Sequence, residues 1–137
     1  MSAITRKIRL ALQAHLVNTP APALPTIDYD NVRFDQEPGV PYIQAQFAQL
    51  ARRPAVRGPD PEHRYSGIFL LTVCTPENSG PTAGEEVADQ LQERFNGASS
   101  IQGVDVNVSI EYSEAEMGYH RPPFYCIPVR VGWYCYA

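Results

Sequence analysis

The chain has 137 residues, of which 44% are hydrophobic, and a formal net charge of −4. This length and composition predict a single folded domain, residues 1–137, with a modest core. No apolar run approaches the roughly 18 residues that span a bilayer, and arginines recur within the basic N-terminus. The sequence therefore predicts neither a membrane segment nor a signal peptide.

Residues 3–17 carry an apolar residue at every fourth position, which is the spacing of one face of an α-helix. These residues are Ile4, Ile8, Leu12 and Leu16. The proline-rich run 18–25 ends the helix, because proline lacks an amide hydrogen and restricts the residue before it.

Two strands are expected in the middle of the chain. Residues 42–50 alternate between apolar and polar side chains, as in a half-buried strand. Residues 66–75 are apolar at both odd and even positions, which is typical of a central strand. Between them, residues 51–65 hold three prolines and four arginines and predict a long flexible loop, with room for a short strand around 55–57.

A second helix has clear start and stop signals. Thr82 and Glu85 have the spacing of a capping box, and Gly97 stands where a left-handed residue ends a helix. The apolar stripe between them consists of Val87, Ala88, Leu91 and Phe95. Gly84 lies on this stripe, where the lack of a side chain lets the helix approach the sheet closely.

The chain ends in strands. Residues 104–112 alternate strictly between apolar and polar side chains, and residues 124–136 form a long final strand. The order of elements predicts an α+β fold of two layers, with a mixed or antiparallel β-sheet and two helices packed on one of its faces.

The three cysteines are predicted to be buried free thiols. Their odd number, in a chain without an export signal, argues against a disulfide framework. Cys126 and Cys135 lie nine residues apart on one predicted strand, too far apart to bond each other. Cys74 lies in a very apolar strand, where a thiol is inert. A nucleophilic pair of Cys74 with His63 or His120 is the open alternative.

The acidic stretch 27–37 is the candidate cation site in the sequence. A calcium loop needs oxygen ligands at alternate positions and a glycine at the turn. Counted from Asp28, Val32 occupies a ligand position and Arg33 replaces the glycine. The histidines and cysteines share no zinc-ligand spacing. The sequence therefore predicts no catalytic residue, no cofactor and no metal.

The arginines of the loop are the remaining candidates for function. Residues 1–67 hold eight Lys or Arg and six Asp or Glu, whereas residues 68–137 hold three and nine. Arginine side chains bind phosphates or acidic protein surfaces, and a merely solvated loop is the competing interpretation. No interleaved aromatic platform is evident, so a protein partner is favoured over specific nucleic-acid binding.

The whole chain resembles a known family. The resemblance rests on Asn31 to Phe34, on the strand entry Gly39 to Tyr42, on the strand SGIFLLTVCTPENSG, on the helix VADQLQERFNG and on the long final hairpin. This pattern is similar to the tail terminator family of long-tailed phages, to which the lambda minor tail protein U belongs. Relatives carry an apolar or Trp-Pro segment before the Asn, whereas this chain has Tyr29 and Asp30.

The resemblance implies a non-enzymatic structural protein that closes into a six-membered ring on the tail tube, stops tube polymerisation and offers a surface for head joining. Its implied partners are copies of itself, the major tail tube protein and a head–tail connector or completion protein. Its implied location is the host bacterial cytoplasm during assembly and then the virion tail. The alternatives are another head–tail joining protein, or a small α+β enzyme or ligand-binding module. The predicted interface residues are Arg52, Arg53, Arg57, Arg64, Asp30, Asn31 and Asp35.

Overall fold

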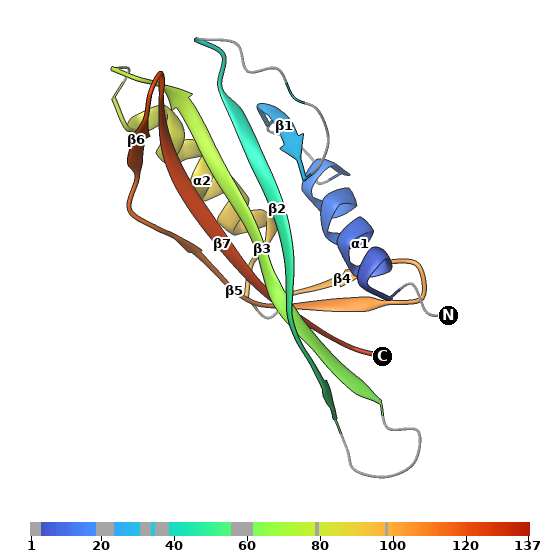
Figure 1. The fold of residues 1–137 in the computed structure, drawn as a ribbon. Helices are drawn as coiled ribbons and strands as arrows, with labels where there is room; N and C mark the ends of the chain where they lie inside the picture. The colour runs from blue at the N-terminus through green and yellow to red at the C-terminus, as the bar shows by residue number, and fades with distance from the viewer. Residues whose placement is uncertain are drawn as a thin grey trace.

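The computed structural model of the protein describes residues 4–18, 24–30, 34, 39–55, 62–78, 80–97 and 99–137, without the side chain of Leu50. The helices are α1 (Ile4–Asn18) and α2 (Thr82–Arg94) (Figure 1). The strands are β1 (Thr26–Tyr29), β2 (Tyr42–Pro54), β3 (His63–Pro76), β4 (Ser100–Gln102), β5 (Asn107–Ala115), β6 (Tyr119–Arg121) and β7 (Phe124–Tyr136).

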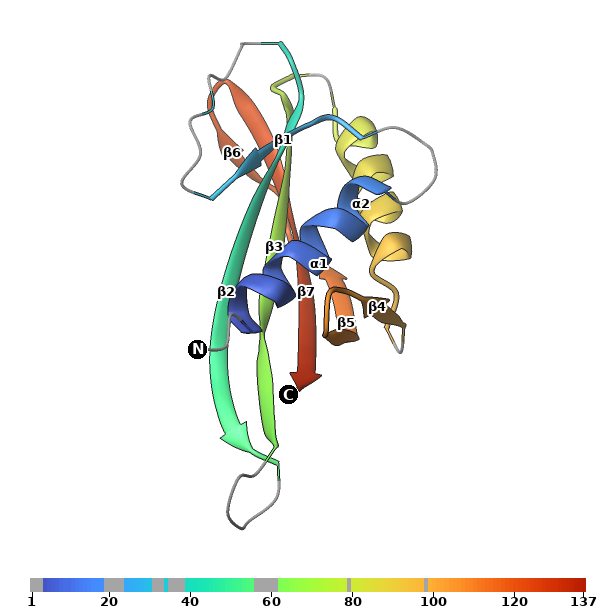
Figure 2. The same ribbon diagram turned by 90° about the vertical axis from the view of Figure 1, so that its right-hand side faces the viewer.

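The described strands form one sheet in the order β1-β2-β3-β7-β5-β4, and β6 pairs with β7. β1 runs parallel to β2, and the other pairings are antiparallel. The pairing register shifts once in β2, between Gln49 and Ala51, and once in β5, between Ile110 and Tyr112. Because bulges of this kind bend a strand and increase its twist, they favour a curled sheet. The sheet curls into a half-barrel around the two helices (Figure 2).

The predicted fold class, a two-layer α+β arrangement, is wrong. The protein is mostly β, and its mixed sheet is a half-barrel rather than one flat layer. Strands β1, β4 and β6 have only three or four residues, too few for an alternating pattern to stand out in the sequence. β2 and β3 also extend into residues 51–54 and 63–65, where the sequence predicts a loop.

The helices begin and end close to the predicted positions. The predicted close approach at Gly84 is confirmed, because a Cβ atom there would lie 3.0 Å from Cδ1 of Ile127. The predicted capping box is wrong, since Pro81 is the N-cap of α2 and no side chain caps it. Gly97 is not left-handed; it lies close to the backbone of Glu111, where a Cβ would be 3.3 Å from the carbonyl oxygen.

One continuous core joins both helices to the sheet. Trp133 of β7 is fully buried in it, and its ring stacks on Phe47 with the centroids 5.3 Å apart. Gly67 pairs with Trp133 across β3 and β7. A Cβ atom on Gly67 would lie 2.7 Å from Cζ2 of Trp133, so only glycine leaves room for the indole. The helical side chains of this core include Ile8, Leu12, Leu16, Ala88, Leu91 and Phe95.

The alternating run 104–112 is only partly a strand. β5 begins at Asn107, and Val104 is 74% exposed in the turn before it. Asp105 has a φ of 60°, the left-handed region, which breaks the extended chain there. The bulge after Ile110 then moves Tyr112 to the other face of the sheet, where its ring lies against Gly132. The alternation of apolar and polar residues therefore continues through a turn and a bulge, and the run does not form one regular strand.

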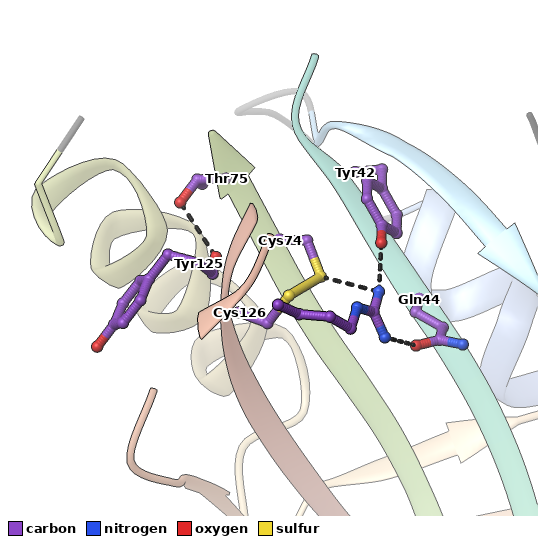
Figure 3. Close-up of a disulfide and its surroundings, with 7 residues drawn as sticks. Tyr42, Gln44, Cys74, Thr75, Tyr125 and Cys126 are labelled. Carbon is purple, nitrogen blue, oxygen red and sulfur yellow. Dashed lines mark hydrogen bonds between the residues drawn. A yellow bond between two sulfur atoms is a disulfide. The ribbon is translucent and has the colours of Figure 1, made fainter. Parts of the chain in front are cut away.

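The prediction of three free thiols is wrong for two of them. Cys74 and Cys126 form a disulfide between β3 and β7, with their Cα atoms 4.2 Å apart (Figure 3). The two cysteines are 52 residues apart and meet because the β3–β7 register places them directly opposite each other. Together with Tyr42 and Phe124 they form a small second core. Cys135 is free and buried, as predicted.

Candidate assembly interface

Three predicted interface arginines lie on a two-stranded extension of the sheet. We call this extension the arm; it consists of Ala51–Pro54 of β2 and His63–Tyr65 of β3, and it projects beyond the helix-covered part of the molecule (Figure 2). The carboxy-terminal end of β7 supports it, because His63 and Ala137 exchange two backbone hydrogen bonds of 2.8 and 2.9 Å. The described part of the arm is therefore an ordered ladder.

The arm carries two arginines, Arg52 and Arg53, whose charge no ion pair balances within the described residues. Both side chains are exposed. Arg53 stands directly opposite Arg64 in the β2–β3 register. Like charges that face each other across a ladder repel and lower stability. An acidic partner would remove this repulsion.

Aromatic rings hold two of these arginines. The guanidinium carbon of Arg52 lies 5.6 Å from the centre of the Tyr65 ring, and that of Arg64 lies 4.7 Å from the centre of the Tyr134 ring. Such cation–π contacts orient the cation at modest energy. Arg64 also approaches Glu111 at 3.9 Å, but both side chains are substantially exposed, so this ion pair contributes little.

The predicted acidic members of the interface lie elsewhere. Asp30 follows β1, and its carboxylate accepts a 2.7 Å hydrogen bond from the backbone amide of Phe47. This hydrogen bond satisfies an amide on the edge of β2, just beyond the residues that pair with β1. Asn31, Asp35 and Arg57 lie outside the described residues. Figure 1 shows β1 and the arm toward opposite ends of the molecule, so the structure does not bring Asp30 to the arm arginines.

Asp28 faces an arginine that the sequence did not single out. Burial raises the pKa of the Asp28 carboxyl, as does the neighbouring Asp30, while Arg121 acts in the opposite direction. Arg121 donates hydrogen bonds to the hydroxyl of Tyr42 and to Oε1 of Gln44. It also lies 3.7 Å from Sγ of Cys74, beside the disulfide. Arg121 thus fastens the β6–β7 hairpin to β2.

The nucleophilic Cys–His pair is not formed. The sulfur of Cys74 is bonded to Cys126, so it is not a thiolate. His120 pairs with Glu77, with 3.0 Å between Nδ1 and Oε2.

Among the described residues, no group of three His, Cys, Asp or Glu is placed to hold a metal ion. Neither described helix is long and apolar enough to cross a membrane.

A groove with acidic walls lies between α2 and the β5–β7 part of the sheet. We call it the carboxylate groove. Glu85 and Asp89 of α2 line one side, Glu116 lines the other, and Tyr125 and Ile127 contribute apolar surface. Its volume is about 280 Å³. Glu116 pairs with Arg130 at 2.8 Å, whereas Glu85 and Asp89 make no ion pair within the described part of the chain.

Comparison with known proteins decides the family. The sequence model of the phage tail terminator protein family matches residues 7–133, almost the whole chain. The chain belongs to the phage tail terminator family. Phage tail terminator proteins are structural proteins of the phage tail, and the predicted resemblance to this family is confirmed.

Four chains of solved structures also match this tail terminator. One of them has a TM-score of 0.76 and 23% sequence identity, over 100% of this chain and 96% of its own. At that identity the likeness shows the fold alone. No curated protein sequence matches the chain.

The arginines of the arm were singled out from the sequence and stay a prediction, whereas their surroundings were missed. Tyr65 and Tyr134 become their ring partners only through the β3 and β7 registers. Glu85 was predicted only as part of a capping box and Asp89 was not singled out, and their meeting with Glu116 depends on how α2 packs. Their spacing of four residues, which places two carboxylates on one helical face, was the available signal.

Proposed function

We propose that this tail terminator forms a hexameric ring on the end of the tail tube, stops tube polymerisation and provides the surface for head joining. Its partners are further copies of itself, the major tail tube protein and a head–tail connector or completion protein. Assembly takes place in the host bacterial cytoplasm, and the ring then remains in the virion tail. The mechanism is geometric, because one face of the ring fits the last tube ring and the other face does not resemble a tube subunit.

The family match supports the tail role, and the arm is the observation that supports the ring. A ring of identical subunits needs a heterologous contact, in which two different surfaces of each subunit match. The arm is a projecting ladder with unpaired Arg52 and Arg53 at one end of the molecule, and the unpaired carboxylates of Glu85 and Asp89 lie away from it. A subunit of this kind has two unlike surfaces.

The predicted interface residues keep this role within the proposal. Arg52, Arg53 and Arg64 of the arm contact a neighbouring subunit, and Arg57, which follows Arg53 in sequence, is assigned to the same contact. Asp30 belongs to a subunit edge, because its carboxylate already occupies the free edge of β2. Asn31 and Asp35 follow it in sequence and are assigned to the same edge.

Native mass spectrometry of the protein mixed with the tail tube protein of the same phage tests this function. We expect a six-membered species, alone or attached to tube subunits. Replacing Arg52, Arg53 and Arg57 by Ala should lower the ring population without unfolding the subunit, which circular dichroism would verify. A protein that stays monomeric in the presence of tube protein would refute the proposed function.

A further inference from the structure

We propose that the arm of one subunit docks into the carboxylate groove of the next copy of the chain. The contact places Arg53 beside Glu85 and Asp89, and it rests on the proposed ring function. It assigns a receptor to the arm, which the family match and the fold likeness leave open.

The arm has the chemistry of an inserting element. Arg53 extends to the face of the strand opposite Arg52, which lies over the Tyr65 ring, because consecutive residues of a strand point to opposite sides. Both side chains are exposed and lack ion pairs within the described residues, and Arg53 faces the like charge of Arg64. Pro54, which is also exposed, removes a backbone amide at this point. The arm therefore offers guanidinium donors that lack carboxylate acceptors.

The groove has the complementary chemistry. Glu85 and Asp89 are four residues apart on α2, so their carboxylates lie on one face of the helix one turn apart. Both are exposed and without ion pairs in the described part of the chain. Ile127, Ala88 and Tyr125 provide an apolar floor against which arginine methylene groups can pack. The volume of about 280 Å³ is below the ~300–1,000 Å³ of typical small-molecule sites and suits an inserted side chain.

The two surfaces of one subunit cannot meet. In both ribbon views the arm projects from one end of the sheet, whereas α2 covers the part of the sheet toward the other end (Figures 1 and 2). The contact therefore needs a second copy, and every copy has one arm and one groove. Repeating this contact joins identical subunits head to tail, which is the connection that a closed ring requires.

Asp30 is the competing receptor, and the structure favours the groove. The Asp30 carboxylate already accepts the Phe47 amide. Glu85 and Asp89 provide two unpaired carboxylates on one wall. Charge complementarity of this kind also sets the register and the rate of association between subunits.

A charge-reversal exchange tests the docking. Arg52→Glu with Arg53→Glu, and separately Glu85→Lys with Asp89→Lys, should each lower the ring population with tube protein by about tenfold. Combining all four substitutions should restore most of it, because the two signs are exchanged rather than lost. Glu93→Lys makes the same type of change on α2 one turn beyond Asp89, outside the groove, and should leave the ring population unchanged.

Chemical cross-linking provides a second measurement, which detects the contact directly in assembled rings. In the Arg53→Lys variant, a carbodiimide should join the introduced amine to Glu85 or Asp89 of another copy, and mass spectrometry of peptides from isotopically mixed rings would identify the link. Rings that persist through both reversals, rings not restored by the four-fold variant, or coupling to Asp30 instead would overturn the docking while the ring function stands. The absence of rings in the wild type would instead overturn the proposed function itself.

Discussion

The helix-covered body and the arm are built from the same two strands, β2 and β3, yet different forces hold them. In the body these strands carry buried residues such as Ile43 and Phe69, which pack under both helices. In the arm they carry exposed Arg52 and Arg53 and half-buried Arg64, and two of these arginines lie over aromatic rings. The body thus has what a subunit needs to fold alone, and the arm carries charge that another subunit can balance. Stability and assembly should therefore be separable by mutation.

The largest effect is expected in the body. Trp133→Ala removes a fully buried indole and its stacking on Phe47, so it should lower the free energy of unfolding by about 3–5 kcal/mol. The control is Tyr136→Ala, three residues further along β7 and 50% exposed, which should cost less than about 1 kcal/mol. Urea unfolding measures both. Equal losses in the two variants would mean that burial in the core does not decide the stability of the subunit.

The disulfide should have the next largest effect. The Cys74→Ala and Cys126→Ala double variant should lose about 2–4 kcal/mol of unfolding free energy, because the bond restricts the unfolded chain. A phosphine reductant should destabilise the wild type and leave the double variant unchanged. If thiol titration of the unfolded, air-oxidised protein finds three free thiols, this assignment fails.

A smaller effect on stability is expected at Gly67, where β3 lies close to the Trp133 ring. Gly67→Ala places a methyl group against the Trp133 ring and the backbone of Ala48, which should cost about 1–3 kcal/mol. Ser66→Ala, the preceding residue on the opposite face of β3, serves as the control and should change stability by less than about 0.5 kcal/mol. A neutral Gly67→Ala variant would mean that the indole has space to move.

The smallest effect is expected in the arm and has the opposite sign. Arg53→Gln removes the like charge opposite Arg64, so it should raise the free energy of unfolding by a few tenths of a kcal/mol at low salt. The gain should vanish in 1 M salt, where the Debye length falls to about 3 Å. Thermal unfolding at two salt concentrations measures it. A loss of stability at low salt would show that Arg53 supports the subunit itself.

Elements with long uninterrupted periodicity were predictable from the sequence. α1 has 15 residues with a regular apolar stripe, and β7 is a largely apolar run of 13 residues; both begin and end close to the predicted positions. Gly84 was predictable because its place on the apolar stripe of α2 follows from helical geometry alone. The start of β5 was not, since Val104 and Val106 continue an alternation while the backbone turns at Asp105.

Features that depend on pairing were not predictable. The Cys74–Cys126 bond, the stacking of Trp133 on Phe47 and the half-barrel arise from strand registers that local periodicity does not encode. The candidate interface also has a part that was predictable from the sequence and a part that was not. Its arginines stand out in the sequence by charge, whereas the groove exists only after α2 packs against β7 and β5.

The most direct test of the proposed terminator function is the length of tail tubes, measured by electron microscopy. Purified tube protein would be polymerised with increasing amounts of this tail terminator, with the Arg52→Glu and Arg53→Glu variant as the matched control. The wild type should shorten the tubes in proportion to its concentration and leave a ring at one end of each tube, while the variant should have a weaker effect. Tubes of unchanged length at saturating wild-type protein would contradict the proposed function.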